Sequence, residues 1–99
     1  MIKNSEPKYT LKLSTKFKKH LKLVTKRNKD NARMIREVVN ALQHGEKLPE
    51  RYRDHALKGD WEGHREYHIK PDLLLIYRIF EDVLILELID TGSHSDLFE

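Results

Sequence analysis

The chain has 99 residues and a mass of 11.8 kDa, which allows one domain with a modest core and leaves no room for a large cofactor cradle. Hydrophobic residues make up 38% and charged residues 35%, with only 4 Gly and 3 Pro, a composition typical of a compact charged globule rather than of disorder. The absence of cysteine excludes a disulfide framework, a thiolate zinc site and a cysteine nucleophile, and it fits a reducing compartment. No apolar stretch approaches the roughly 18 residues of a membrane helix. Because residues 1–10 also lack the apolar centre of a signal peptide, we expect a cytoplasmic protein.

Charge is divided unevenly along the chain. The formal net charge is +3, but residues 1–54 carry 15 Lys and Arg against 6 Asp and Glu, a net charge of +9. Residues 55–99 carry 4 against 10, a net charge of −6, together with four of the six histidines. The first half therefore predicts a surface for an acidic partner, and the second half gathers imidazoles with carboxylates.

The first half predicts a strand followed by two helices. Tyr9–Leu13 alternates apolar and polar residues, as a half-exposed strand does. A helix is then expected from Ser14 to about Arg27, because Phe17, Leu21 and Val24 recur at helical spacing and Ser14 or Thr15 can cap it. A second helix, capped by Asp30 or Asn31 and ended by Gly45, has a wide apolar stripe made by Met34, Ile35, Val38, Val39, Ala41 and Leu42.

The second half predicts strands. A polar loop, Glu46–Asp54, and a loop around Gly59 lead to three expected strands: Gly63–Ile69, Leu73–Phe80 and Val83–Asp90. Pro71 has no N–H for a strand ladder, so Lys70–Asp72 is expected to turn the chain, and Glu81–Asp82 is the expected turn between the last two strands. The predicted fold class is α+β, a single domain over residues 1–99 with the order β-α-α-β-β-β, in which two helices pack on a small, mostly antiparallel sheet.

The first helix carries a basic face. Its lysines are Lys16, Lys18, Lys19, Lys22 and Lys26. A solvated lysine face is one interpretation, and a footprint for a phosphate backbone is the other. The clustering of cations in one half and the scarcity of acids on the helix favour RNA or DNA, although an acidic protein fits the same surface.

The segment from His64 to His68 offers a second signal with three interpretations. In a strand, His64, Glu66 and His68 project from one face and Arg65 and Tyr67 from the other. Two imidazoles and a carboxylate can bind zinc, but neighbours on one strand point side by side and rarely close around one ion. Ordinary polar residues on an edge strand are the second interpretation, and acid–base chemistry without a metal is the third.

Acid–base chemistry suits RNA because RNA carries its own nucleophile, the 2′-hydroxyl. Cleavage needs a base for that proton, an acid for the leaving 5′-oxygen and cations near the phosphate. His55, His68 and His94 are candidates for the proton transfers, and Asp72 or Glu66 can orient an imidazole. Bases can stack on aromatic residues, for which the candidates are Trp61, Tyr77 and Phe98, with core packing as the alternative and the favoured one for Tyr77.

Three ordered motifs in the second half resemble the YafQ branch of the RelE/ParE toxin superfamily. They lie in Tyr52–Trp61, with the pattern DHxLxG, in Arg65–Tyr77, with RExHIxPD, and in Thr91–Phe98, which begins TGSH. The match covers nearly half the chain, and the preceding strand and two helices agree with that fold.

The resemblance implies a bacterial type II toxin, namely a ribosome-dependent endoribonuclease that cuts messenger RNA in the A site without a metal or other cofactor. It also implies a cognate antitoxin that holds the toxin inactive, and the acidic residues of such an antitoxin would match the basic half. The motif positions that carry the family's functional residues are His55, His68, His94, Asp72, Glu66, Phe98 and Arg65. His64 matches none of the family's functional histidines and is expected to be a surface residue.

Asp90 departs from the family pattern. Members often have arginine immediately before the final TG turn, so Asp90 would replace a phosphate-stabilising cation with an anion. Arg65, Lys58 or ribosomal RNA would then have to supply the positive charge.

Two rival functions remain open at the level of sequence. The ParE branch has a similar fold and acts on DNA gyrase, so this chain could be a binding protein without nuclease activity. The other rival is a metal-dependent hydrolase that uses His64, Glu66 and His68.

Overall fold

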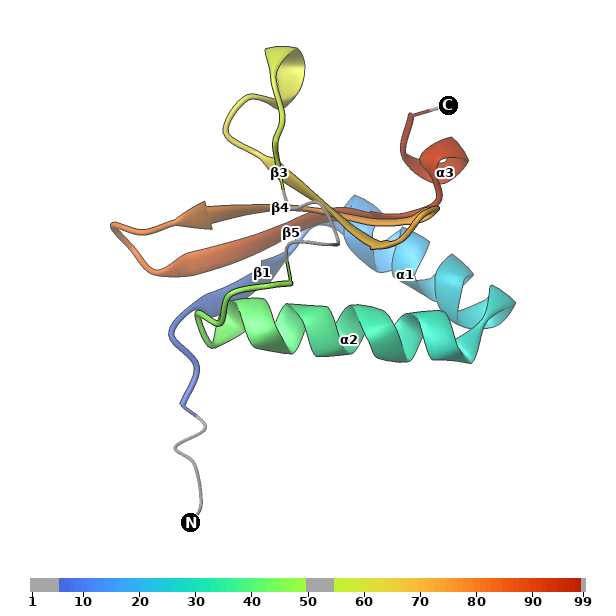
Figure 1. The fold of residues 1–99 in the computed structure, drawn as a ribbon, viewed down its shortest axis with the longest axis horizontal. Helices are drawn as coiled ribbons and strands as arrows, with labels where there is room; N and C mark the ends of the chain where they lie inside the picture. The colour runs from blue at the N-terminus through green and yellow to red at the C-terminus, as the bar shows by residue number, and fades with distance from the viewer. Residues whose placement is uncertain (1–5, 50–54, 99) are drawn as a thin grey trace.

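The computed structural model describes residues 6–49 and 55–98 and contains a mixed sheet with helices on both faces (Figure 1). The sheet has the strand order β1-β5-β4-β3-β2. The strands are β1 (Thr10–Leu13), β2 (His55–Ala56), β3 (Arg65–Lys70), β4 (Leu73–Phe80) and β5 (Ile85–Gly92). The helices are α1 (Thr15–Arg27), α2 (Lys29–Gln43), the 3-10 turn η2 (Gly59–Trp61) and α3 (His94–Phe98). The predicted α+β class, with two helices packed on a small sheet, is confirmed.

Strand β5 lies inside the sheet, with β1 parallel on one side and β4 antiparallel on the other. Strand β3 pairs antiparallel with β4, and the short β2 pairs antiparallel with β3. The register of β4 and β5 shifts between Ile76 and Tyr77. The sheet is thus antiparallel except at β1.

The start of α1 agrees with the prediction, but the start of α2 does not. The Ser14 hydroxyl accepts a hydrogen bond from the Phe17 N–H at 2.9 Å and caps α1. The expected caps of α2, Asp30 and Asn31, are wrong: the Asn28 side chain accepts hydrogen bonds from the N–H groups of both residues, at 2.9 and 3.2 Å. Helix α2 therefore begins at Lys29, directly after α1, because one asparagine between the helices provides the cap.

Gly45 ends α2 as predicted. Its φ of +75° lies in the left-handed region, and its N–H donates to the Leu42 carbonyl at 3.0 Å.

Strand boundaries in the second half differ from the sequence prediction at three places. Strand β3 begins two residues later than expected, at Arg65, after a turn in which the His64 N–H donates to the Trp61 carbonyl at 3.0 Å. Strand β5 begins at Ile85, because Val83 is exposed and Leu84 adopts a left-handed φ of +53° in a turn of four residues. Without a glycine, Glu81–Asp82 does not form a two-residue turn.

Two elements, β2 and α3, were not predicted at all, whereas β4 agrees with its predicted range. Five residues of the expected loop Glu46–Asp54, residues 50–54, lie outside the described residues.

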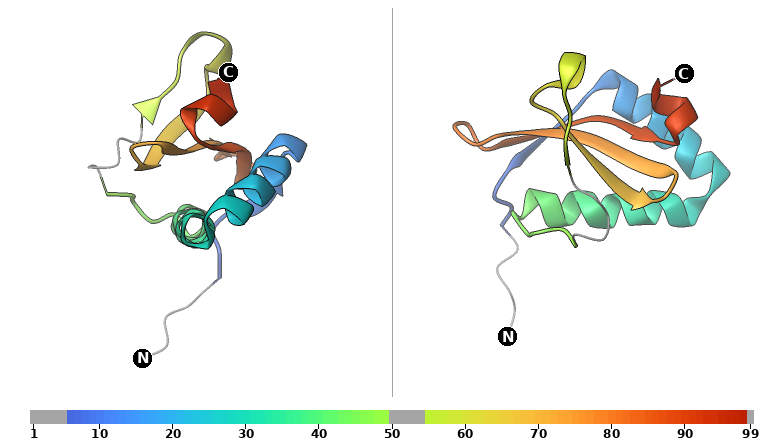
Figure 2. Two further views of the ribbon diagram at one scale, coloured as in Figure 1. Left: turned by 90° about the vertical axis from the view of Figure 1, so that its right-hand side faces the viewer. Right: turned by 45° about the horizontal axis from the view of Figure 1, so that its top comes forward.

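The elements form three layers (Figures 1 and 2). Helices α1 and α2 cover one face of the sheet and bury the main core, which includes Phe17, Ile35, Tyr67, Leu75 and Leu88. The opposite face carries α3 and the segment around η2, over a smaller core of Leu74, Ile76 and Leu97. Strand β4 is buried on both faces, as the sequence predicts. Among the described helices, none is both long and apolar enough to cross a membrane.

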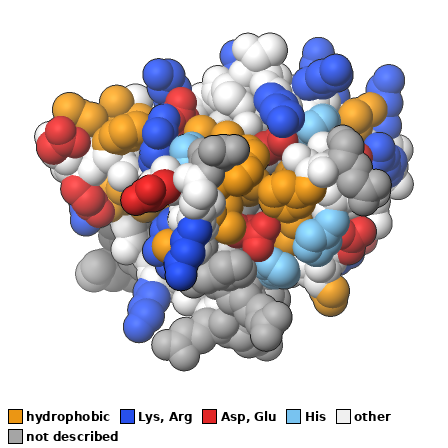
Figure 3. Space-filling model, turned by 90° about the horizontal axis from the view of Figure 1, so that it is seen from above, with side chains coloured by type: hydrophobic (Ala, Val, Ile, Leu, Met, Phe, Trp, Pro, Cys, Tyr) orange, Lys and Arg blue, Asp and Glu red, His pale blue; other side chains and the backbone are white. Residues whose placement is uncertain are grey.

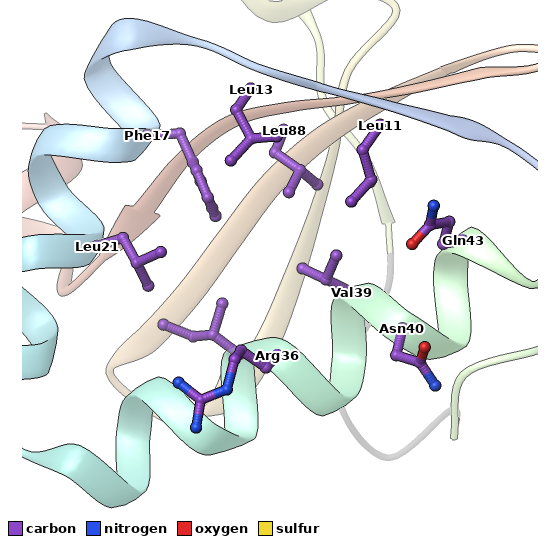
Figure 4. A pocket seen from close by; sticks show the side chains of 10 residues that line it. Leu11, Leu13, Phe17, Leu21, Arg36, Val39, Asn40, Gln43 and Leu88 are labelled. Carbon is purple, nitrogen blue, oxygen red and sulfur yellow. The ribbon is translucent and has the colours of Figure 1, made fainter. Parts of the chain in front are cut away.

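A groove with a volume of about 270 Å³ opens between α1, α2 and β1 (Figure 4). Its lining is mostly apolar, with Leu11, Leu13 and Leu21 on one side and Val39 on the other, and Arg36 lies at its edge. The groove therefore combines an apolar floor with a positively charged rim.

Candidate functional site

Strand β3 presents a paired carboxylate and imidazole to the face that carries α3. Glu66 Oε1 lies 2.9 Å from His68 Nε2, within hydrogen-bond distance, and Glu66 is only 8% exposed. Tyr67, between them, points into the main core on the helix side. The alternation expected of this strand therefore places Glu66 and His68 together, as predicted.

A second carboxylate–imidazole pair joins the turn after β3 to α3. The backbone N–H of His94 donates to Asp72 Oδ1 at 2.9 Å, and His94 Nδ1 lies 2.6 Å from the same oxygen. The hydrogen bonds from the His94 backbone and side chain, with the charge of His94, lower the pKa of Asp72 below its usual range despite partial desolvation. Asp72 is therefore ionised at neutral pH.

The two pairs face each other. The ring centroids of His68 and His94 are 5.9 Å apart, with the rings inclined at 71°. Residues 26 positions apart are brought together because β3 and β5 both flank β4 and α3 follows β5 directly. Figure 3 views this face and shows histidine side chains beside acidic and hydrophobic ones.

An aromatic group continues from the histidines. The Phe98 ring lies 6.4 Å from the His94 ring and 6.3 Å from the Trp61 ring, centroid to centroid. Phe98 is 47% exposed, whereas Trp61 packs against the smaller core. Tyr77 is buried in the main core, so the stacking alternative for Tyr77 is wrong and its core interpretation is confirmed.

The other predicted residues of the second half are placed as follows. The His55 backbone pairs with Glu66 in the sheet, but its side chain lies outside what the structure describes. Arg65 begins β3 opposite Tyr77 and is partly buried, and Lys58 is exposed just before η2.

His64 is separate from the two pairs. Its Nδ1 lies 3.2 Å from the Trp61 carbonyl oxygen and its ring meets the Trp61 indole edge-on. Within residues 6–49 and 55–98, no three His, Asp or Glu side chains are grouped closely enough to hold a metal ion. This arrangement does not favour a metal centre of His64, Glu66 and His68.

The predicted RNA-binding lysines lie on a different layer from the histidines. Lys16, Lys19, Lys22 and Lys26 are exposed on α1, which covers the opposite face of the sheet. Only the C-terminal end of α1 reaches α3, through an ion pair between Arg27 and Asp96. The basic surface therefore adjoins the histidine face at one corner.

Asp90 has a structural environment that the sequence does not reveal. Its side chain is fully buried on the helix side of β5, where Oδ1 lies 2.5 Å from His20 Nδ1 and accepts the Thr91 N–H at 2.9 Å. Lys16 Nζ lies 3.6 Å from Oδ2. Asp90 therefore does not replace a cation beside the histidine pairs; it joins β5 to α1. Sequence reasoning missed His20 as its partner, and no local pattern could have indicated it.

The site can transfer protons in both directions. Each imidazole has its own carboxylate, which can fix the ring and stabilise its protonated form. Two such rings can act as base and acid on one substrate, and the aromatic rings beside them offer a surface for a nucleobase.

Comparison with known proteins agrees with this geometry. The family model described as "Bacterial toxin of type II toxin-antitoxin system, YafQ" matches residues 9–99. The mRNA interferase toxin YafQ of Escherichia coli K12 is 35% identical over 88 residues, which cover 89% of this chain and 94% of that protein.

Solved structures give the same result. The toxin in the E. coli DinJ–YafQ complex has a TM-score of 0.80 and 34% identity, covering 92% of this chain and 99% of its own. A metal-bound toxin from Helicobacter pylori has a TM-score of 0.82 and 42% identity, covering 91% and 99%. The chain belongs to the YafQ family of bacterial toxins of type II toxin–antitoxin systems.

Proposed function

We propose that this protein is a messenger RNA endoribonuclease that acts on the ribosome, needs no metal and is neutralised by an antitoxin. The observation that carries the proposal is the pair of carboxylate-linked imidazoles, His68 with Glu66 and His94 with Asp72, whose rings are 5.9 Å apart. The E. coli relative named an mRNA interferase supports the same class of substrate.

In the proposed reaction, one histidine takes the proton of the 2′-hydroxyl and the other gives a proton to the leaving 5′-oxygen. The 2′-oxygen forms a bond to phosphorus as the bond to the 5′-oxygen breaks, which leaves a 2′,3′-cyclic phosphate and a 5′-hydroxyl. Phe98 and Trp61 hold the adjoining base, and Arg65 and Lys58 supply positive charge near the phosphate. His55 completes the set as a proton-transfer or phosphate-binding residue.

The ribosome is proposed to bind the basic face of α1. We expect replacement of Lys19, Lys22 and Lys26 by Gln to raise KM for ribosome-bound messenger about ten-fold and to lower the salt dependence of binding by about two to three charges. Lys47→Gln, on a loop remote from α1, is the control and should change KM by less than about two-fold. An unchanged salt slope in the triple variant would assign the ribosome to another surface.

The antitoxin is proposed to use the same helix layer. An acidic segment can neutralise the α1 lysines while its apolar side chains fill the groove of Leu11, Leu21 and Val39. The E. coli DinJ–YafQ complex shows that a relative of this fold binds such a protein.

Primer extension on a messenger incubated with purified protein tests the proposal. We expect cuts when the messenger is being translated, few cuts in the same RNA without ribosomes, and no effect of a chelator. The absence of cuts under every condition would favour the ParE-like alternative, a binding protein without nuclease activity. Cuts that a chelator removes and zinc restores would instead require a metal.

A further inference from the structure

Helix α3, which carries His94, is held by a network that begins on α1. The Asp96 carboxylate accepts the Ser93 N–H at 2.9 Å, and the Ser93 hydroxyl accepts the Asp96 N–H at 3.2 Å, which forms a reciprocal capping box at the start of α3. Asp96 Oδ2 also receives Arg27 Nη1 at 2.9 Å. One carboxylate oxygen therefore fixes both the helix cap and the contact with α1.

The space around Asp96 leaves little freedom for another arrangement. A Cβ on Gly92 would lie 2.7 Å from Asp96 Oδ2, and Gly92 has a φ of +139° that L side chains rarely adopt. The Asp96 side chain is 14% exposed. Burial alone would raise its pKa, but the Ser93 N–H, Arg27 and the Ser93 hydroxyl outweigh burial and hold the pKa below its usual range.

The network adjoins the catalytic pair directly. Ser93 and His94 are consecutive, and His94 makes two contacts with Asp72 through its backbone N–H and its ring. A short helix of five residues has few internal hydrogen bonds, so its orientation depends on its cap, on the burial of Leu97 and on Arg27. A displacement of about 1 Å can cost a reaction a large factor in rate.

We propose that Arg27 is a positioning residue that fixes α3, and with it His94, from the end of the basic helix. The inference rests on the proposed function for its effect on catalysis, although the structural link from Arg27 to α3 stands apart from it. Arg27 does not itself touch His94. Because it ends the helix that is proposed to bind the ribosome, it joins that surface to the proton-transfer site.

Lys26 provides a matched control. It is the preceding residue of α1 and is also exposed, and Lys26→Met removes one positive charge, as Arg27→Met does. Loss of charge should raise KM similarly in both variants, but only Arg27→Met should release α3.

The experiment compares Arg27→Met, Arg27→Lys and Lys26→Met in the full chain. Amide hydrogen exchange at Leu97, whose N–H donates to the Ser93 carbonyl at 3.1 Å, should be about two- to five-fold faster in Arg27→Met, the effect of one ion pair with an exposed partner. In the ribosome assay its kcat should fall about five- to ten-fold below that of Lys26→Met. Arg27→Lys, which can restore the ion pair, should recover most of both.

Two outcomes would overturn the proposal. Equal exchange in Arg27→Met and Lys26→Met would show that Arg27 does not hold α3. Faster exchange with equal kcat would show that α3 needs no such support for catalysis. If the wild-type protein cuts no messenger, the proposed function fails, and the exchange measurement still decides whether Arg27 holds α3.

Discussion

Replacing His68 by Ala is expected to lower the rate of ribosome-dependent cleavage by about 10² to 10⁴, because it removes one of the two proposed proton-transfer groups. The Glu66 carboxylate beside it would lose its His68 contact. His68 lies on the less covered face and is not part of the main core, so the variant should still fold. Primer extension at a single time course measures the loss, and recovery of bacterial growth on expression measures it in cells.

His64→Ala is the matched control for this experiment. It makes the same change four residues away on the same segment, at a histidine whose ring nitrogen lies by the Trp61 carbonyl. Its cleavage rate should stay within about three-fold of the wild type, the range of an ordinary surface substitution. An equal loss in both variants would favour the hydrolase that uses His64, Glu66 and His68 together, and undiminished cleavage by His68→Ala would refute the assignment of His68.

Replacing Asp90 by Arg is expected to unfold the protein or nearly so. The sequence resemblance alone would predict a gain of activity, because arginine is frequent at this position in the family. The structure predicts the opposite, since the new guanidinium would enter a fully buried site beside His20 and Lys16. Breaking a buried pair in this way costs about 3–5 kcal/mol, out of roughly 5–15 kcal/mol for a typical domain.

Thermal unfolding measures the effect of Asp90→Arg, with a fall in Tm of more than about 12 °C expected for a domain of this size. Asp90→Asn keeps the shape and can still accept the Thr91 N–H, so it should unfold at a temperature between those of the two proteins. A well-folded Asp90→Arg variant that cleaves faster than the wild type would contradict the structural role of Asp90.

The parts of the fold that could be predicted from sequence are those whose signal is local. Phe17 and Val24 repeat at helical spacing, Ser14 is followed by its own helix, and Leu73–Phe80 is a branched apolar run, so α1 and β4 were predicted at nearly their observed bounds. The cap of α2 was misplaced by two residues because Asn28, Asp30 and Asn31 are all competent caps, and only the end of α1 selects Asn28.

The parts that could not be predicted depend on contacts between distant residues. Helix α3 has five residues, too few for a periodic pattern, and it is held by Leu97 in the smaller core and by Arg27. The motifs indicated that His68 and His94 belong to one site, but not which carboxylate each would take. The sequence also gave no reason to pair Asp90 with His20, 70 residues away.

The position of β5 between β1 and β4 has a consequence for synthesis of the protein. Strand β1 is made early but finds its only partner among residues 85–92, and α1 packs against that same strand. Closing so long a loop must precede the contacts that stabilise it. A nascent chain that stalls before residue 85 therefore lacks the strand that holds its first layer, and His94 has not yet been added. The cell is accordingly exposed to cleavage activity only after release of the chain, by which time a neighbouring antitoxin can already be waiting.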